Sequence, residues 1–379
     1  IFCFNANAHL KMHSNIFISQ IILNNFRSHQ NFSINTNSKN IVLYGENGAG
    51  KTNILESVSL LSPGRGLRNA KSEEIINKKN GLNFALTTNV NFNDSSIKIQ
   101  KIHNKNSILK SSILIDDEKA KSSDLLNYLR VIWITPVMEK IMLQSNSERR
   151  NFFDRLIFNI EKNHLKSFAG FNKFTKERLY ILKSNEIDSN WLEQIELKIA
   201  KYAFEIITIR KKTIAMINSN LSTISKPFNS CIIDLIYDNS LQLSEDEEIF
   251  ISHYVEDLSR NRAIDRELNR TILGPNKVEV KMWKLDDKSI EAKYCSTGEQ
   301  KSILISIILS VAQIIKNSEF ENSPIILIDE AMAHLDQNHR EALVSELSKL
   351  NTQVWYTGVT KNIFDHLSKD TDFFEVKRS

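Results

Sequence analysis

The sequence predicts an α/β fold in which a discontinuous head domain is interrupted by an inserted α-helical arm. Three observations predict it: a phosphate-binding loop follows a short apolar run near residue 41, two carboxylates end an apolar run near residue 327, and long helical stretches lie between them. Because the phosphate-binding loop and the two carboxylates would act on one ligand, we expect the strand before the loop and the strand before the carboxylates to lie side by side in one sheet. The predicted domains are an unpatterned N-terminal extension (1–15), the head (16–136 and 286–379) and the arm (137–285).

The first part of the head has a mixed α/β pattern. Ile16 to Phe32 predicts a strand, a turn and a second strand, and Ile41 to Tyr44 predicts a buried strand that stops at Gly45. Thr52 to Leu61 has the apolar spacing of a helix, and Leu82 to Asp116 alternates as antiparallel strands do.

The arm begins after Pro136, where the sequence becomes helical with little Gly or Pro. A 3–4 spacing over about three heptads predicts a helix packed along its length, with Asn190 and Glu193 at its start; the spacing runs through Leu192, Ile195, Ile199, Tyr202, Ile206, Ile209, Thr213 and Met216. So short a seam favours a helical hairpin packed on itself over an intermolecular coiled coil. The acidic stretch from Ser244 to Glu248 predicts a solvated helix start.

The second part of the head returns to α/β. It predicts a buried helix, a strand from Ile325 to Ile328, a helix from Asn338 to Leu350 and a strand from Gln353 to Thr357. The longest apolar run, Ile303 to Ile315, is too short and too polar to span a bilayer.

Composition narrows the classes of function. The net charge of +4 permits polyanion binding, and three well-separated cysteines and scattered histidines argue against a disulfide framework or a zinc site. The start of the sequence lacks a basic region followed by an apolar one, so we expect a cytoplasmic protein without membrane partners. We also expect translation to start at Met12, where the first patterned stretch opens.

The strongest motif is a P-loop of the form GxxxxGK[ST]. Its glycines let backbone N–H groups surround phosphate, its lysine would contact the β- and γ-phosphates of ATP, and its hydroxyl would ligate Mg²⁺. The eight residues are Gly45, Glu46, Asn47, Gly48, Ala49, Gly50, Lys51 and Thr52.

The second motif is the apolar run that ends in Asp329 and Glu330. Asp329 is placed to hold Mg²⁺ together with Thr52, and Glu330 to polarise the attacking water. Alone such a pair is a common helix start; paired with the P-loop it predicts ATP hydrolysis, with Glu330 and Lys51 as catalytic residues.

A third motif, Cys295 to Gln300, precedes a helix about thirty residues before Asp329. It resembles the LSGGQ-type element of ATP-binding-cassette and SMC proteins, in which Ser and Gly grip the γ-phosphate on the other subunit; here these would be Ser296 and Gly298, followed by Glu299. The alternative is a simple helix cap. His334-Leu335-Asp336 follows like the D-loop of that superfamily.

Several segments in one order resemble the RecF family of SMC-type ATPases. They are LNNFRSHQNFSI, the P-loop, ESVSLLSPGRGLRNAKSEEI, ITPVMEKIMLQSNSERRNFFDRLI, RTILGPNKVEV, STGEQK and LIDEAMAHLD. The resemblance implies an ABC/SMC-type ATPase head with a short helical arm, an ATP-dependent homodimer, DNA binding, weak DNA-stimulated ATP hydrolysis, and loading of RecA at gaps with RecO and RecR in DNA repair, replication and the SOS response.

The sequence departs from the family pattern at three places. Asn276 stands where the family usually has His in its Gly-Pro-His motif, followed by the hydrophobic Val278. Thr357-Gly358 stands near the switch-histidine position, which suggests a slow or differently organised hydrolytic step, and no Q-loop glutamine can be placed near Thr135.

Basic residues near the motifs predict phosphate contacts to DNA without sequence readout. The candidates are Arg65, Arg68, Arg149 and Arg150, with Lys98, Lys101, Lys105 and Lys110; for each one a solvated or paired charge is the alternative.

Other P-loop classes fit less well. A transporter ATPase has about a hundred residues between P-loop and signature, an SMC condensin needs far longer heptad segments, and a metabolite kinase would have neither STGEQ nor the arm. A DNA clamp that hardly hydrolyses ATP stays open as an alternative to an enzyme.

Overall fold

The computed structural model describes residues 16–378, except 80, 93–94, 107–109, 185–187, 225, 239–240, 319–322, 331 and 333–334. The predicted extension over 1–15, Met12 and His334 therefore lie outside the described residues. The chain forms two compact units, which we call the head unit (1–138 and 308–379) and the arm unit (139–307).

The arm unit ends at 307/308, whereas the predicted boundary between the arm and the second part of the head is at 285/286. The cause is a set of contacts around Asn229 of the arm: its N–H donates to Ser302 Oγ at 2.7 Å, and its carbonyl accepts from Ser306 Oγ at 2.7 Å. These bonds tie the first half of the following helix, α8 (Thr297–Asn317), to the arm unit.

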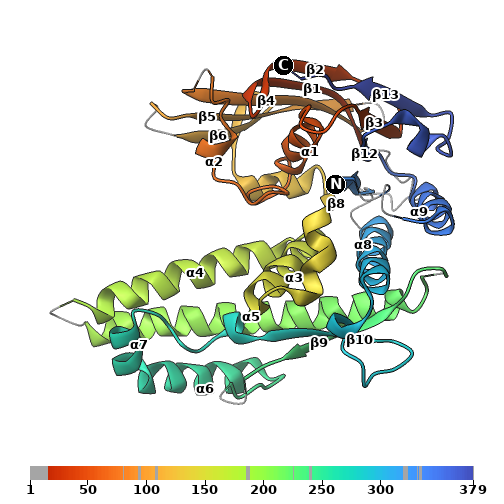
Figure 1. Ribbon diagram of the computed structural model, residues 1–379. Coiled ribbons are helices and arrows are strands. Elements are labelled where there is room, and N and C mark those ends of the chain that lie inside the picture. Colours follow the sequence, from red (N-terminus) through yellow and green to blue (C-terminus); the bar gives the residue numbers. More distant parts are fainter. Residues whose placement is uncertain are drawn as a thin grey trace, which may run out of the picture. The chain divides into compact units, whose positions relative to one another are not determined.

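A five-stranded parallel sheet forms the centre of the head unit (Figure 1). Its strand order is β13 (Thr371–Glu375), β3 (Asn40–Tyr44), β12 (Val354–Gly358), β11 (Ile325–Ile328) and β8 (Val131–Ile134). The expectation that the P-loop strand β3 and the carboxylate strand β11 are neighbours is wrong. β12 lies between them. The crossover from β11 through α9 (Gln337–Leu350) places β12 beside β11, and β3 pairs with the other edge of β12.

A six-stranded antiparallel sheet is the second layer of the head unit, and it confirms the alternating pattern seen in the sequence. Its order is β2-β1-β4-β5-β6-β7, with bounds β1 Ile16–Phe26, β2 His29–Asn35, β4 Asn83–Phe92, β5 Ser95–Asn104, β6 Ser111–Ile115 and β7 Glu118–Ala120. Ile16 and Ile18 of β1 are buried before a register shift at Ile18/Gln20, and Ile21 and Leu23 are buried after it, so the strand keeps one apolar face.

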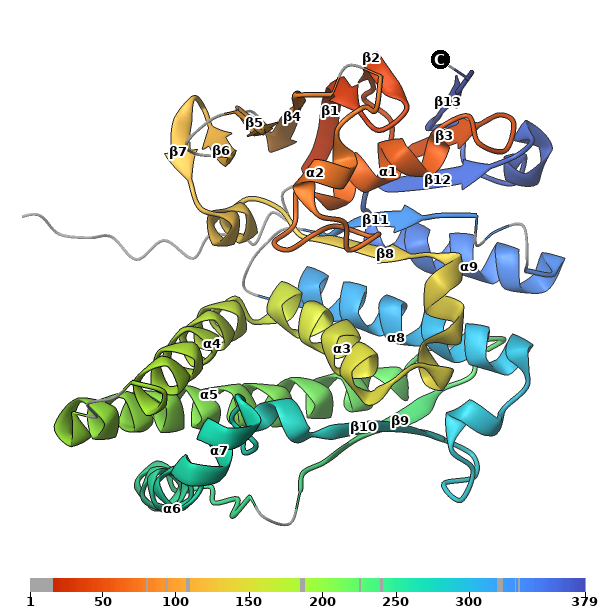
Figure 2. The same cartoon turned by 60° about the vertical axis from the view of Figure 1, so that its left-hand side comes forward.

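The P-loop helix α1 (Lys51–Ser59) is buried on nearly all its faces. In Figure 2 it lies on one face of the parallel sheet, and α9 (Gln337–Leu350) lies on the other. Buried hydroxyl groups of α1 have hydrogen-bond partners: Ser57 Oγ donates to the Ile54 carbonyl and Ser59 Oγ donates to the Glu56 carbonyl. A short helix, α2 (Ser72–Ile75), follows it.

The arm unit is helical, with one two-stranded ribbon (Figure 1). Its elements are α3 (Asn146–Ile160), α4 (Asn163–Leu182), α5 (Ser189–Leu221), α6 (Glu247–Arg260), α7 (Arg262–Leu268), β9 (Cys231–Ile236) and β10 (Glu279–Lys284). α4 and α5 pack as an intramolecular hairpin and share a core with α6. Two predictions are confirmed here: the self-packed hairpin, and the acidic helix start, where Asp246 caps α6.

Two details of α5 correct the sequence expectations. Asp188, not Asn190, caps the helix, because its side chain accepts from Trp191 N at 3.0 Å. The predicted seam is also wrong at its last position: Ile206 and Thr213 are buried as expected, but Met216 is 41% exposed while Ile217 is buried. A straight helix has 3.6 residues per turn, so its buried stripe drifts away from a heptad pattern.

An ion cluster with three fully buried members lies in the arm unit. Arg178 of α4 donates to Glu196 of α5 at 2.9 Å and to Asp265 of α7 at 2.6 Å. Arg262, whose side chain is 27% exposed, pairs with the other oxygen of Glu196 at 2.6 Å. The three buried charges therefore fix three helices to one another where water does not reach them.

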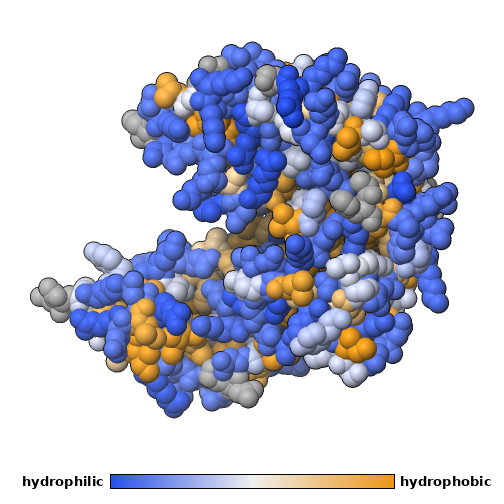
Figure 3. Space-filling model, in the orientation of Figure 1, coloured by the Kyte–Doolittle hydropathy of each residue, from blue (hydrophilic) through white to orange (hydrophobic). Residues whose placement is uncertain are grey.

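The predicted buried helix is confirmed as α8. By length and composition it is the one helix in the described ranges that could cross a membrane, but 83% of the relevant window is buried inside the protein. The surface in Figure 3 is mainly hydrophilic, with hydrophobic side chains gathered over the end of the arm unit near α7. Exposed apolar residues in α5, α6 and α7 include Trp191, Ile249, Ile264 and Leu268.

Candidate functional site

The P-loop joins β3 to α1 and has the backbone of an anion-binding turn. Gly45 and Gly50 have φ values of 142° and 104°, which residues with side chains rarely adopt. A Cβ on Gly45 would collide with the Val376 carbonyl, and one on Gly50 would lie 2.6 Å from both His29 Nε2 and Ser28 Oγ. Both positions therefore need glycine for conformation and for space.

Lys51 folds back over this loop. Its ammonium donates to the carbonyl oxygens of Gly45 at 2.7 Å and Glu46 at 2.9 Å, and the residue is only 4% exposed. Burial lowers the pKa of Lys51, while the nearby Glu330 and Asp329 act in the opposite direction. The lysine thus closes the loop around the space where a phosphate oxygen would replace its backbone partners.

Two hydroxyls converge on one oxygen of Asp329. Thr52 Oγ1, from the start of α1, donates to Asp329 Oδ1 at 2.9 Å, and Thr357 Oγ1, from the end of β12, donates to the same atom at 2.8 Å. Burial raises the pKa of Asp329, and both hydrogen bonds act against that rise. Thr52 therefore joins the P-loop directly to the end of the carboxylate strand, and Thr357 of the intervening strand holds the same oxygen.

Glu330 follows Asp329 and is held by the same threonine. Its backbone N–H donates to Thr357 Oγ1 at 2.9 Å, and its φ of 53° is in the left-handed region. A non-glycine residue in this region stores about 1–3 kcal/mol of strain. The strained backbone separates the direction of the Glu330 side chain from that of Asp329.

The donor set fits Mg²⁺. Carboxylate and hydroxyl oxygens are ligands that Mg²⁺ prefers, and a divalent cation would offset the burial of Asp329. Among the described residues, no group of three His, Cys, Asp or Glu side chains could hold a metal ion alone. Phosphate and water oxygens would therefore have to complete the coordination, as is usual for Mg²⁺ in nucleotide sites.

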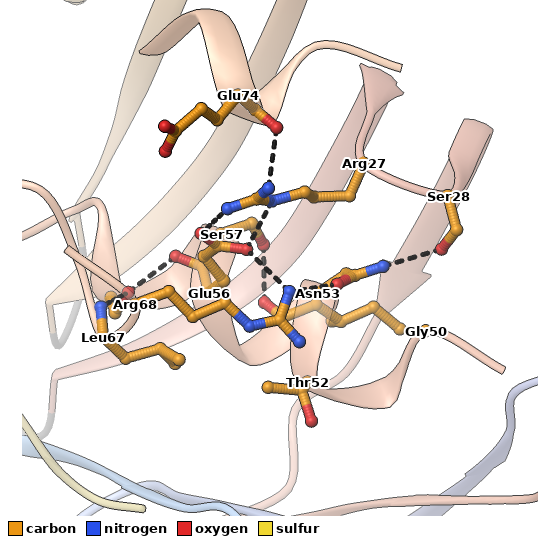
Figure 4. Close-up of polar contacts among 12 residues, drawn as sticks. Arg27, Ser28, Gly50, Thr52, Asn53, Glu56, Ser57, Leu67, Arg68 and Glu74 are labelled. Atoms are coloured by element: carbon orange, nitrogen blue, oxygen red, sulfur yellow. Dashed lines mark hydrogen bonds and ion pairs between the residues drawn. The ribbon is translucent and has the colours of Figure 1, made fainter. Parts of the chain in front are cut away.

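A buried carboxylate on α1 gathers two arginines beside the P-loop (Figure 4). Glu56 is fully buried; Arg27 donates to its two oxygens at 2.8 and 2.6 Å, and Arg68 to one of them at 3.3 Å. Arg68 also donates to Asn53 Oδ1 at 2.7 Å. These bonds hold Arg68 against the P-loop helix, although its side chain is still 40% exposed, and its contact with DNA stays a prediction.

Sequence reasoning missed the residues that pack against the loop from outside it. His29 Nε2 donates to the Gly50 carbonyl at 3.1 Å, Ser28 Oγ accepts from Asn53 Nδ2 at 2.7 Å, and Arg378 donates to the Asn47 carbonyl at 2.9 Å. Burial lowers the pKa of His29. For Ser28 and His29 the one signal in the sequence was the polar turn that holds them between β1 and β2. For Arg378 there was no signal, because nothing in the sequence places it near the P-loop, which lies more than 300 residues away.

The signature-like motif lies in the arm unit at the start of α8. Ser296 and Glu299 form a reciprocal cap, with Ser296 N donating to Glu299 Oε2 at 3.0 Å and Glu299 N donating to Ser296 Oγ at 3.3 Å. Lys284 donates to Glu299 Oε1 at 2.9 Å and, as the largest cause, holds the pKa of Glu299 at about 2. Ser296 and Gly298 are exposed, and a Cβ on Gly298 would meet nothing within 4 Å.

The remaining predicted DNA contacts divide into two kinds. Arg149 donates to the carbonyls of Val280 and Gln144 at 2.8 and 2.6 Å, and its side chain is 11% exposed. Arg150 donates to the Val278 carbonyl at 3.1 Å. These two arginines support the ribbon and the residue that precedes it through internal carbonyls, whereas Arg65 is exposed, and a contact of any of the three with DNA stays a prediction.

Comparison with known proteins identifies the family. Residues 17–378 match the family described as RecF/RecN/SMC N terminal domain. The chain is 33% identical over 347 residues to the DNA replication and repair protein RecF of Rickettsia bellii (strain OSU 85-389), covering 90% of this chain and 94% of that protein. The chain belongs to the RecF family. The RecF protein of Rhizobium rhizogenes is 30% identical over 365 residues, 95% of this chain and 97% of its own.

Solved structures agree with the fold. The structure described as the recombination mediator protein RecF-ATP in the RecFOR pathway superposes with a TM-score of 0.84 at 23% identity, covering 98% of both chains. An Smc head domain from Pyrococcus furiosus gives a TM-score of 0.51 at 17% identity, covering 96% of this chain and 94% of that one. The predicted fold class, an α/β head of the SMC type with a helical arm, is confirmed in this RecF-family chain.

Proposed function

We propose that this RecF-family protein is an ATP-dependent DNA-binding protein of replication and recombinational gap repair. ATP would drive two copies together around DNA, and slow, DNA-stimulated hydrolysis would release them. The observation that carries the proposal is the convergence of Thr52 and Thr357 on Asp329 beside the P-loop. Relatives named DNA replication and repair proteins support the process. By the same family argument, we propose a cytoplasmic protein that loads RecA with RecO- and RecR-like mediators, also in the SOS response.

Each residue of the site has a proposed task. The backbone N–H groups of Gly45 to Thr52 would bind the phosphates of ATP, and Lys51 would exchange its two carbonyl partners for phosphate oxygens. Thr52 and Asp329 would hold Mg²⁺, which supplies charge neutralisation at the phosphates. Glu330 would orient and deprotonate the attacking water, while Thr357 keeps Asp329 and Glu330 in register.

The composite site would need a second copy of the chain. Ser296 and Gly298 are exposed at the start of a long helix, where backbone N–H groups and the helix dipole favour an anion. In the proposed dimer they would bind the γ-phosphate held by the partner's P-loop. Glu299 positions Ser296 through the reciprocal cap rather than by touching the nucleotide.

One observation favours a slow reaction. The position near the end of β12 that the resemblance assigns to a switch histidine is a buried threonine, which cannot act as an acid or base at neutral pH. A clamp with negligible hydrolysis is therefore the second candidate function.

Turnover and binding assays on three proteins separate these functions. Wild-type protein should hydrolyse ATP faster with gapped DNA than without it. Lys51→Ala should lose ATP binding, and Glu330→Gln should keep ATP binding while turnover falls by about 10²-fold or more, the usual size of a lost general base.

Equal turnover in wild type and Glu330→Gln, with ATP-dependent DNA binding retained in both, would establish the non-hydrolysing clamp. A wild-type protein that binds neither ATP nor DNA would contradict both functions.

A further inference from the structure

A second cationic pocket lies in the head unit, away from the P-loop. It has a volume of about 350 Å³ and is formed by the segment after α1 together with β5 and β6. Four basic side chains and one carboxylate line it, beside a histidine: Arg65, Lys71, Lys101 and Lys110, with Glu73 and His103. The P-loop adjoins the first residue of α1 and the pocket adjoins Leu60, just past its last, so roughly 14 Å of helix separates them.

Lys101, on β5, is the central cation of this pocket. Its ammonium has one hydrogen-bond partner, the Leu60 carbonyl at the long distance of 3.4 Å. Within the described part of the chain it forms no ion pair, and burial lowers the pKa of Lys101 to about 8. A largely buried cation without a counter-anion is costly, and a bound anion would relieve that cost.

His103 supplies an independent observation in the same pocket. The residue is 3% exposed, its Nδ1 lies 2.7 Å from Ser111 Oγ, and its ring stacks on Phe84 with centroids 5.8 Å apart. These contacts fix the ring, yet His103 Nε2 is buried and has no hydrogen-bond partner. When Nδ1 accepts from the serine hydroxyl, Nε2 carries a proton that has no acceptor among the described residues.

We propose that this pocket binds a phosphate group, with Lys101 as its counter-cation, His103 Nε2 as a directed donor, and Arg65, Lys71 and Lys110 at its rim. Glu73 opposes the anion, but four cations outnumber it, and a phosphate group offers acceptor oxygens to all of these donors at once. The inference deepens the proposed function and rests on it in one respect: we take a strand of bound DNA as the natural source of the phosphate.

The phosphate could come from the backbone of DNA, from a strand end or from a free phosphate ligand, and three probes distinguish these sources. They are a duplex without terminal phosphates, the same duplex with terminal 5′-phosphates, and inorganic pyrophosphate. Affinities are measured by fluorescence anisotropy for DNA and by titration calorimetry for pyrophosphate, on full-length protein. The test variant is Lys101→Met, which keeps the length of the side chain and removes its charge.

The control is Lys119→Met on β7 of the same sheet. Lys119 is exposed and does not line the pocket, so its loss removes a surface charge of the sheet without changing the proposed site. Lys110→Ser removes an exposed rim cation and covers the case in which Lys101→Met does not fold.

Loss of one charged phosphate contact should weaken binding about tenfold and reduce the salt dependence by about one ion. A loss with both duplexes identifies backbone phosphate as the source, a loss confined to the phosphorylated duplex identifies a strand end, and a loss for pyrophosphate alone identifies a free phosphate ligand. Lys119→Met should match wild type throughout.

Pyrophosphate also separates the pocket from the P-loop. Wild type should bind it at two sites, Lys51→Ala should keep the pocket site, and Lys101→Met should keep the P-loop site. If wild type binds pyrophosphate at the pocket but binds no DNA, the proposed function fails and the pocket stands. If Lys101→Met and Lys110→Ser bind all three probes like wild type, the pocket proposal is overturned.

Discussion

At the scale of single residues, Thr357 organises the candidate site. It is 1% exposed, donates to Asp329 Oδ1 and accepts from Glu330 N, so one hydroxyl controls both carboxylate-bearing residues. A histidine at this position could contact the nucleotide itself; a buried threonine can act only through its neighbours. Thr357 is therefore a positioning residue.

Thr357→Val should lower kcat for ATP about tenfold and change KM less than threefold. The isosteric side chain keeps the packing but leaves the Glu330 N–H unpaired, at a cost of about 1–3 kcal/mol. Steady-state kinetics check it, with Thr371→Val on β13 as a control whose hydroxyl meets only the Ser368 carbonyl. An effect on KM alone would contradict the positioning role.

Lys101 should make stability depend on alkaline pH. Its folded-state pKa of about 8 is below the ordinary lysine pKa of 10.5, so between these values the unfolded state binds more protons. Stability should therefore rise as pH increases from about 8 to 10.5, and the cost of the buried charge should be fully present below pH 8.

Melting temperatures of wild type and Lys101→Met over this range test the linkage. The variant should be more stable at pH 7, and its advantage should shrink towards pH 10.5. An advantage that is constant with pH would mean that Lys101 titrates normally in the folded protein.

At the scale of elements, local pattern predicted most of the secondary structure. The strand predicted from Ile325 to Ile328 has those bounds, because four consecutive buried residues leave no other register. The P-loop helix and the antiparallel strands were equally predictable. The P-loop, Asp329 and Glu330 could also be named as a candidate site, because their spacing carries the chemistry in the sequence.

Long-range pairing could not be predicted. The order β3-β12-β11 depends on which edge of β12 the P-loop strand joins, and no local pattern records it. For the same reason Thr357 received no role in coupling Asp329 to Glu330, and Arg27 was not matched to Glu56. The last seam position of α5 was misassigned. The buried stripe of this helix also includes Arg210, which a hydrophobic pattern omits but which bonds both oxygens of Asp154 at 2.8 and 2.7 Å.

Asp265→Asn should loosen the arm unit without unfolding the head unit. Asp265 is fully buried and pairs with Arg178, so removing its charge leaves that guanidinium undercompensated. Breaking such a pair costs about 3 kcal/mol, equivalent to roughly 100-fold faster amide exchange in α4, α5 and α7.

Hydrogen exchange followed by mass spectrometry measures this effect, with β3 and β12 of the head unit expected to keep their protection. Glu256→Gln, which removes an exposed pair with Arg260, should change protection by less than about 1 kcal/mol. Unchanged exchange in Asp265→Asn would show that the buried cluster does not hold the three helices together.

At the scale of the whole molecule, the proposed function requires two copies of the chain. The P-loop belongs to the head unit, whereas Ser296 and Gly298 belong to the arm unit. In the proposed dimer each ATP would bind to the P-loop of one copy and the signature-like motif of the other. ATP would then be the ligand that couples dimerisation to DNA binding.

The most direct test of that claim is the molecular mass in solution of Glu330→Gln, measured by light scattering with and without ATP and gapped DNA. The account predicts a monomer without ATP, a dimer with ATP that DNA strengthens, and a monomer under all conditions when Ser296→Arg is added. A mass that ATP does not change, in a protein shown to bind ATP, would contradict the composite site and with it the proposed way of holding DNA.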